Sequence, residues 1–156
     1  MAMVQIQNSY TIANFDGKYA WLSNFAESPI EYEGIQYPTV EHAFQAAKTF
    51  DGDKRAAIAE LETPGKAKRA GRNLQLRTDW EVVKMPIMFE LLLLKFADPV
   101  LKASLLETGD CLLIEGNNWH DNIWGVCTCD NCKCTGKNTL GTLLMAIRHL
   151  YCSGRL

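Results

Sequence analysis

The chain has 156 residues, of which 47% are apolar and 22% are charged, a balance typical of one globular domain rather than a disordered or fibrous chain. Sixteen basic against eighteen acidic residues give a net charge of −2, which excludes a protein that coats nucleic acid through its overall charge. The N-terminus lacks the apolar core of a secretory signal and no apolar run could cross a bilayer, so we expect a cytoplasmic protein without membrane contact.

The predicted elements are a few short strands at the start of the chain and mostly helices after it. Turn residues and apolar patterns first predict strands over Tyr10–Phe15 and Ile30–Tyr37, with a small hairpin. Helices follow over Thr39–Thr49, Lys54–Glu62, Pro64–Gly71, Trp80–Ala97 (kinked or started at Pro86) and Pro99–Thr108. The chain then has a buried strand over Leu112–Glu115 and a helix from an Asn138 N-cap through Tyr151. We therefore predict an α+β fold, helix-dominated, with a small sheet of short strands, as a single domain over residues 1–156.

The helix predicted over Thr39–Thr49 separates two faces of different chemistry. Its apolar residues share one face, while Glu41, Gln45 and Lys48 fall within roughly 60° of one another on a second face. Such a column of carboxylate, amide and amine groups could hold a polar ligand, although a solvated face of an amphipathic helix is the commoner explanation of this pattern.

A basic stretch lies between Pro64 and Lys84. Its six basic side chains face only Asp79 and Glu81, and they are Lys66, Lys68, Arg69, Arg72, Arg77 and Lys84. The stretch fits either a phosphate-binding surface or a solvated helix face, and the sequence leaves both open.

The segment from Cys111 to Gly141 is too long and too polar for a plain connection, which favours a functional loop. Within it, residues 116–125 bring together amides, an imidazole, a carboxylate and two Trp side chains. Aromatic faces stack on bases, and carboxylates and amides bind ribose hydroxyls.

Motifs along nearly the whole chain together resemble the YbiA-like superfamily, also called NADAR. They occur in order at family-like spacing: Leu22-Ser23-Asn24-Phe25; Tyr37-Pro38-Thr39-Val40-Glu41-His42 with Phe44-Gln45-Ala46 and Lys48; Lys68-Arg69 with Gly71-Arg72; Asp79-Trp80 with Lys84 and Met88; Lys95-Phe96; Thr108-Gly109-Asp110 with Leu113 and Glu115; Asp121 with Trp124-Gly125; and Gly136, Asn138, Leu140-Gly141, Leu144-Met145 and Arg148. The resemblance implies an α+β fold dominated by helices and hydrolysis of N-glycosidic bonds. The implied substrates are ADP-ribosylated guanine in nucleic acid or early riboflavin-pathway intermediates.

The resemblance gives the polar column a role. It implies a Schiff-base lysine in the branch that removes ADP-ribose from guanine, which we map to Lys48, with Glu41 as general acid and base. A seven-residue separation along a helix is about 10 Å, so a sugar fits between the two side chains, and Gln45 would orient a hydroxyl. A Lys48 ion pair with Asp51 and a surface position for Gln45 are the structural alternatives.

Further substrate-binding candidates come from the matching motifs. Asn24 and Phe25 would close over the base, Trp124 would stack on it, Asp121 would bind the ribose, and Arg69 and Arg72 would bind pyrophosphate. His42 would touch phosphate, and the resemblance adds Trp80, Gly125 and Asn138. Core packing is the alternative for Phe25, His42 and Trp124, and Arg148 fits either the site or a structural role.

The six cysteines are expected to be thiols or metal ligands rather than disulfides in an intracellular chain. Four of them form a C-x-C-x-x-C-x-C loop over residues 127–134, namely Cys127, Cys129, Cys132 and Cys134. A structural zinc and a tight loop of reduced thiols are both compatible with this spacing. The reaction itself requires no cofactor.

Two other classes of function stay open. A module that binds NAD or ADP-ribose without hydrolysing it would not require Glu41 and Lys48 together, and a small zinc-dependent interaction protein would centre on the cysteines. For the enzyme, the expected partners are an ADP-ribosyl or ribose-phosphate substrate, and DNA or RNA that carries ADP-ribosyl-guanine. Oligomeric state does not follow from the sequence.

Overall fold

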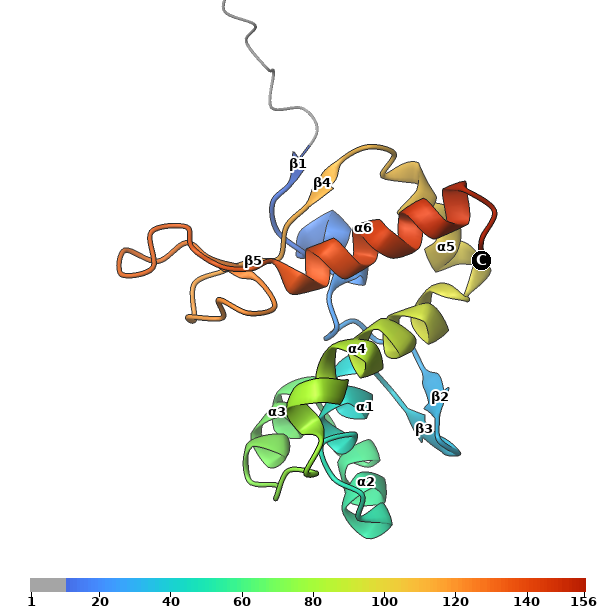
Figure 1. The fold of residues 1–156 in the computed structure, drawn as a ribbon, viewed down its shortest axis with the longest axis vertical. Coiled ribbons are helices and arrows are strands. Elements are labelled where there is room, and N and C mark those ends of the chain that lie inside the picture. Colours follow the sequence, from blue (N-terminus) through green and yellow to red (C-terminus); the bar gives the residue numbers. More distant parts are fainter. Residues whose placement is uncertain (1–10) are drawn as a thin grey trace, which may run out of the picture. The chain divides into compact units, whose positions relative to one another are not determined.

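The computed structural model describes residues 11–156, and this part of the chain is helix-rich with short strands, as the α+β prediction requires (Figure 1). The helices are η1 (Gly17–Leu22, a 3-10 helix), α1 (Val40–Ala46), α2 (Gly52–Ala59), α3 (Pro64–Arg72), α4 (Trp80–Phe96), α5 (Pro99–Glu107) and α6 (Thr139–Cys152). The strands are β1 (Thr11–Ile12), β2 (Ile30–Tyr32), β3 (Ile35–Tyr37), β4 (Leu112–Leu113), β5 (Gly116–Asn117) and β6 (Val126–Cys127). None of these helices combines the length and apolar character that a bilayer crossing requires.

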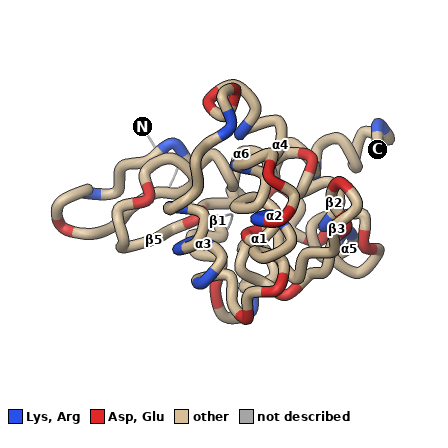
Figure 2. Tube along the Cα trace, turned by 90° about the horizontal axis from the view of Figure 1, so that it is seen from below, with Lys and Arg blue, Asp and Glu red and all other residues tan. Residues whose placement is uncertain are grey.

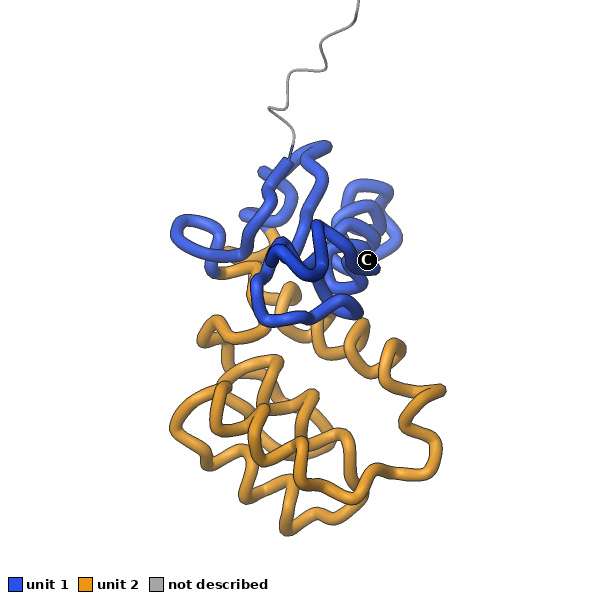
Figure 3. The backbone as a smooth tube through the Cα atoms, turned by 90° about the vertical axis from the view of Figure 1, so that its left-hand side faces the viewer, with its two compact units in different colours: residues 1–20, 103–156 blue, residues 21–102 orange. Residues whose placement is uncertain are grey.

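The chain divides into two compact units (Figure 3). The helical unit comprises residues 21–102, and the terminal unit comprises residues 103–156 with the described residues up to 20. The single-domain expectation stays a prediction.

In the helical unit, α1 lies at the centre and packs against α2, α3 and α4. Its apolar face is fully enclosed, with Val40, Ala43 and Ala46 showing no exposed surface. The predicted hairpin is confirmed: β2 and β3 pair antiparallel, with Ile30 opposite Tyr37 and the turn at Glu33-Gly34. Because α1 is covered on several sides, its polar residues are drawn into the interior with it.

In the terminal unit, one strand pair joins segments about a hundred residues apart and the other joins the two ends of a short loop. β1 pairs with β4 and β5 pairs with β6, both in parallel. The strand predicted over Tyr10–Phe15 is therefore reduced to Thr11–Ile12, and Tyr10 lies outside the described residues. α6 packs on β4 and buries Leu140, Leu144 and Ile147, which confirms the predicted terminal helix.

Several predicted boundaries differ from the structure for local reasons. α2 begins at Gly52, earlier than predicted, because the Asp51 carboxylate caps it by accepting the Lys54 N–H. α4 runs through Pro86 from Trp80, so the helix does not start at the proline. The Val82 carbonyl, which the proline leaves without its helical donor, belongs to a residue that is 78% exposed, so water can take the place of that donor.

Candidate active site

The polar column predicted on α1 is buried. Glu41 is 6% and Gln45 is 4% exposed, which rules out a solvated helix face as its explanation. Thr39, at which the predicted helix begins, is the N-cap of α1, since its side chain accepts the His42 N–H. The Gln45 amide, through Nε2, donates to Glu41 Oε1 at 2.7 Å. The buried Glu41 carboxylate is therefore held by the amide of Gln45, one turn further along the helix. Glu41 lies in the first turn of α1, where the helix dipole favours a negative charge.

Lys48 lies in the turn that follows α1 rather than in the helix, which ends at Ala46 instead of Thr49. Its N–H donates to the Gln45 carbonyl in a tighter, 3-10-type step, and its own carbonyl accepts the Arg77 N–H at 2.7 Å. The side chain is half-buried, with Nζ 6.0 Å from the centre of the Trp80 ring. The backbone at Lys48 is thus fixed from two directions.

The charge on Lys48 is disfavoured by its surroundings. Burial lowers the pKa of its amine, and the cations of Lys68 and Arg72 lower it further, while the Glu41 carboxylate opposes them. The predicted alternative of an ion pair with Asp51 is not what the structure has, because Asp51 pairs with Lys54 at 3.5 Å. A larger fraction of Lys48 is therefore neutral, and hence nucleophilic, at neutral pH than for an exposed lysine.

Gly71 on α3 makes room for the column where α3 crosses α1. A Cβ atom at Gly71 would lie 1.9 Å from Gln45 Oε1 and 2.8 Å from its Cδ. Only glycine permits this approach, so the amide of Gln45 fills the space next to the α3 backbone. Gln45 Oε1 is buried and accepts no hydrogen bond from the described residues.

Asn24 and Phe25 are carried by the loop after η1. Asn24 is buried: its carbonyl accepts the Glu41 N–H at 3.1 Å, and its Nδ2 is 3.4 Å from Met88 Sδ. Its Oδ1, like Gln45 Oε1, is a buried acceptor without a hydrogen bond in residues 11–156. Phe25 is 44% exposed rather than a core residue, and Lys68 Nζ is 5.8 Å from the centre of its ring.

Half of the basic stretch is already paired. Lys66 pairs with Glu62, Lys84 with Glu81, and Arg77 with both carboxylate oxygens of Asp79. The remaining basic residues all lie on α3, where Arg69 and Arg72 are exposed and Lys68 is half-buried; they are Lys68, Arg69 and Arg72 (Figure 2). The possible phosphate-binding surface is therefore confined to one helix.

Two other candidates in the helical unit serve its packing. His42 is 1% exposed; its Nε2 lies 3.0 Å from the Leu61 carbonyl and its Nδ1 lies 2.8 Å from Thr39 Oγ1. Both ring nitrogens are thus occupied, and burial lowers the pKa of the ring, so His42 is a neutral core residue rather than a phosphate contact. Trp80 is also buried, packs on Phe44 with ring centroids 5.1 Å apart, and forms the apolar wall beside Lys48.

The candidates in the terminal unit hold its loops together. Asp121 Oδ1 accepts the N–H groups of Ile123 and Trp124, which closes a turn, and Trp124 is half-buried. Asn138 bridges two segments by accepting the Glu115 N–H and donating to the Leu113 carbonyl. It precedes α6 as predicted, but with φ +50° and no capping hydrogen bond, because its amide is used in that bridge.

Gly125 is needed for a close backbone approach, since a Cβ there would lie 2.3 Å from the Glu115 carbonyl oxygen. The side chain of Arg148 is likewise structural, because it donates to Thr108 Oγ1 and to the Cys111 carbonyl. The motif residues of this unit thus form a hydrogen-bonded frame.

The cysteine loop brings together a set that differs from the predicted one. Cys127, Cys129 and Cys132 group with His120, with potential ligand atoms all within 4.8 Å of one another, whereas Cys134 is exposed and lies outside the group. His120 enters because the turn after β5 returns toward β6, which residue spacing alone does not reveal. We call His120, Cys127, Cys129 and Cys132 the thiol cluster.

The family model of the NADAR domain matches residues 12–150. This chain belongs to the NADAR family. N-glycosidase YbiA of Shigella boydii is 41% identical over 144 residues, which cover 88% of this chain and 87% of that protein. The NMR structure of E. coli YbiA has a TM-score of 0.78 and 38% sequence identity, covering 94% of this chain and 88% of that one. The riboflavin biosynthesis protein PYRR, chloroplastic, of Zea mays is 34% identical over 144 residues, or 81% of this chain and 22% of that protein.

The comparisons confirm the family and fold predicted from the motifs.

The structure of this NADAR chain adds residues that sequence reasoning did not include among the candidates. Lys68 and Gly71 stand beside the column, and both belong to the matching motif on α3. Lys95 is 1% exposed and donates to the Ser23 carbonyl at 2.8 Å, and burial lowers the pKa of its amine to about 7. A lysine within the apolar run of α4 was the signal that could have identified it.

Proposed function

We propose that this NADAR protein is an N-glycosidase that hydrolyses the bond between ribose C1 and a base nitrogen. Its proposed substrate is ADP-ribosylated guanine in nucleic acid, from which it would release ADP-ribose. The enzyme requires no cofactor for this reaction. The observation that carries the proposal is that a half-buried lysine whose pKa is lowered, Lys48, lies within the electrostatic influence of a buried carboxylate, Glu41.

The surroundings of these two groups suit a phosphorylated ribose. The buried oxygens Gln45 Oε1 and Asn24 Oδ1 lack a hydrogen bond within residues 11–156, which costs free energy, so rotation of either amide to accept a ribose hydroxyl would be favoured. The cations of α3, led by Lys68 and Arg72 near Lys48, suit the negative charge of a phosphate or pyrophosphate. The exposed ring of Phe25 offers a stacking face for a base.

The reaction can be written with side chains of the helical unit alone. Glu41 takes a proton from the Lys48 ammonium and gives it to the ring oxygen as the C1–O4 bond opens, and the neutral Lys48 amine that results adds to C1. The amine proton passes by way of Glu41 to the base nitrogen, the C1–N bond breaks, and the free base leaves. The remaining imine between C1 and Lys48 adds water, which releases ribose with its aldehyde and regenerates the amine.

The proposal is tested with an oligonucleotide that carries ADP-ribosyl-guanine. We expect wild-type protein to release ADP-ribose, and borohydride added during turnover to leave a sugar adduct on Lys48, located by peptide mass spectrometry. Lys48→Ala should abolish both release and adduct, and Glu41→Gln should abolish release. Lys54→Ala is the matched control, because Lys54 is exposed and pairs with Asp51 at the surface.

Normal turnover by Lys48→Ala, with circular dichroism showing that it is folded, would remove the imine from the mechanism. Turnover without any trapped adduct in wild type would favour direct attack of water assisted by Glu41. Binding of the oligonucleotide without turnover would point instead to a module that recognises ADP-ribose.

A second candidate substrate is an early riboflavin-biosynthesis intermediate, in which a base is also joined to a ribose phosphate. The specific support is the relative in Zea mays that is named a riboflavin biosynthesis protein. Incubation with these intermediates in a parallel reaction separates the candidates: cleavage of the intermediates alone would make the protein a metabolite hydrolase. Cleavage of the oligonucleotide alone would make the modified nucleic acid the substrate.

A further inference from the structure

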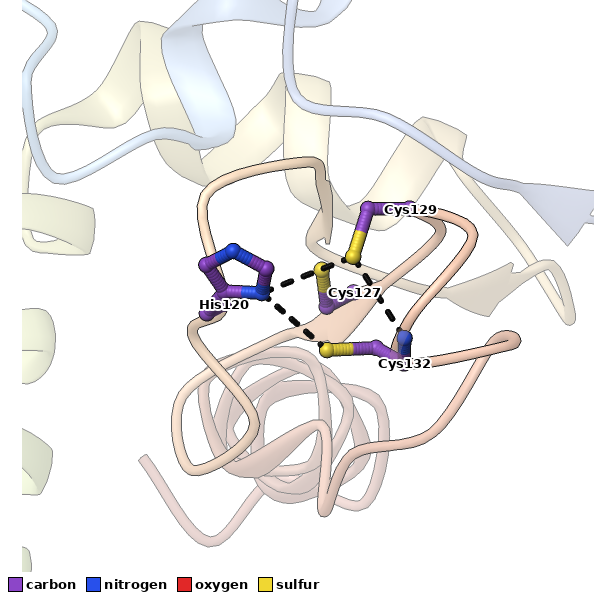
Figure 4. Close-up of side chains that lie close together, drawn as sticks. All are labelled: His120, Cys127, Cys129 and Cys132. Carbon is purple, nitrogen blue, oxygen red and sulfur yellow. Dashed lines mark hydrogen bonds between the residues drawn. The ribbon is translucent and has the colours of Figure 1, made fainter.

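The proposed mechanism uses no residue of the thiol cluster, which has the composition of a metal site (Figure 4). Its members come from two segments of the terminal unit: His120 from the turn after β5, and the cysteines from β6 and the loop that follows it. Figure 4 shows the imidazole and the three thiols pointing toward one another. Four potential ligands therefore surround one point.

The contacts within the cluster are close. His120 Nδ1 lies 3.3 Å from Cys132 Sγ and 3.4 Å from Cys129 Sγ. All four ligand atoms are within 4.8 Å of one another. In a tetrahedral zinc site the sulfurs lie about 2.3 Å from the metal and hence about 3.8 Å apart, so small side-chain rotations bring this set to the required geometry.

The neighbouring donors also suit thiolates. The Cys132 N–H is 3.4 Å from Cys129 Sγ, and Asn122 Nδ2 is 3.7 Å from Cys132 Sγ. N–H groups that face ligating sulfurs are the usual second layer of a thiolate–metal site, where they offset the negative charge. All three cysteines are free thiols, and Cys127 is fully buried.

We propose that His120, Cys127, Cys129 and Cys132 bind one Zn²⁺ as a structural site. Four protein ligands close the coordination sphere and leave no position for a substrate or a reactive water, so this metal has no part in glycosidic cleavage. This ligand set differs from an all-cysteine one, because His120 takes the place that Cys134 would have.

The metal would join the turn at His120 to β6. Between His120 and Cys127 lie Trp124 and Gly125, whose carbonyls accept the Leu140 and Asn138 N–H groups at the start of α6. Asp121 Oδ1 accepts the Trp124 N–H in the same segment. In this segment Cys127 pairs with Asn117 on one side, through two-residue strands, and with Thr135 on the other, through a single bridge. Short strands of this kind are weak alone, so a metal crosslink would supply the rigidity that they lack.

The test is metal analysis of the full chain purified under reducing conditions, followed by replacement of the metal with Co²⁺. We expect one zinc per chain that survives gel filtration in EDTA, and a Co²⁺ form with thiolate charge-transfer and tetrahedral d–d absorption. Cys132→Ser and His120→Ala should lower bound metal at least tenfold. Cys134→Ser is the matched control and should retain it, since Cys134 is exposed and outside the cluster.

Several results would overturn the proposal. One is reduced wild-type protein that holds no stoichiometric zinc after EDTA filtration and gives no tetrahedral Co²⁺ spectrum. Another is loss of metal from Cys134→Ser equal to that from Cys132→Ser, since it would restore the all-cysteine set. Because a ligand variant can fail to fold, titration of wild-type protein with a mercurial provides a second measurement. Three of the six thiols should react without release of zinc, and the release of one zinc should accompany reaction of the other three; fewer than three thiols coupled to zinc release would refute the ligand set.

Discussion

Lys95 gives a prediction about stability that can be worked through from the structure. Its amine is buried at 1% exposure and has a pKa of about 7 instead of the ordinary 10.5. Between these two values the unfolded chain binds a proton that the folded chain lacks, so the free energy of unfolding must rise with pH across this window and level off above it. Below pH 7 both states are protonated, and the charged amine is buried at a constant cost.

The size of the effect follows from the shift in pKa. The full window from 7 to 10.5 corresponds to about 5 kcal/mol, of which about 2 kcal/mol falls between pH 7 and pH 9. Lys95→Met keeps the length of the side chain but cannot titrate, so the variant should lose this rise. It also removes the hydrogen bond to the Ser23 carbonyl, at a cost of about 1–3 kcal/mol that does not depend on pH.

The assay is urea unfolding of wild type and Lys95→Met at pH 7, 8 and 9 in the presence of a reductant. The difference in free energy between the two proteins should change by about 2 kcal/mol over this range, in favour of wild type at the higher pH. Lys54→Met, which alters an exposed lysine, should run parallel to wild type. Parallel curves for Lys95→Met as well would refute a lowered pKa at Lys95.

Two further predictions concern the polar column. Gly71→Ala should destabilise the protein and reduce kcat/KM, because the new Cβ atom would overlap three atoms of the Gln45 side chain, a clash that costs up to about 3 kcal/mol and exceeds the gain of about 1 kcal/mol in helix propensity. Gln45→Ala alone should also lower Tm, because it removes the hydrogen bond to Glu41, but the double variant should lose less stability than the two single variants together, since the shortened side chain no longer brings an amide against the new Cβ atom. A rise in Tm for Gly71→Ala alone would contradict the clash. Lys68→Ala should raise the pKa of Lys48 and move the acid limb of the pH–rate profile to higher pH, whereas Lys66→Ala, at the surface of the same helix, should leave it unmoved. Equal displacement by both variants would show that Lys68 has no particular effect on Lys48.

Local chemistry made much of this fold predictable. Thr39 identified the start of α1 because hydroxyl capping depends on residues three positions apart. The hairpin over β2 and β3 followed from a Glu-Gly turn between alternating apolar residues. The columnar placement of Glu41 and Gln45 likewise needed only helical periodicity.

The features that escaped prediction depend on tertiary contacts. Asn138 precedes α6, yet its amide bridges Glu115 and Leu113 because a strand 25 residues earlier in the chain offers better partners than the helix end. Burial of the Glu41 side depends on α3 crossing α1 at Gly71. His120 lies in the thiol cluster because the loop between the parallel strands β5 and β6 turns back on itself. Parallel pairing of this kind leaves no short-range pattern in the sequence.

The hydrogen bond from the Arg77 N–H to the Lys48 carbonyl ties the backbone of the proposed nucleophile to the short segment that links α3 to α4. The length of that link, residues 73–79, therefore helps to set the position of the Lys48 backbone. A residue inserted or deleted there would displace the amine relative to the carboxylate of Glu41, although no active-site side chain had changed. Natural or designed NADAR proteins that alter this link should then differ in reaction rate rather than in substrate affinity. The cations on α3 precede the link in the chain, so a change in its length would not displace them.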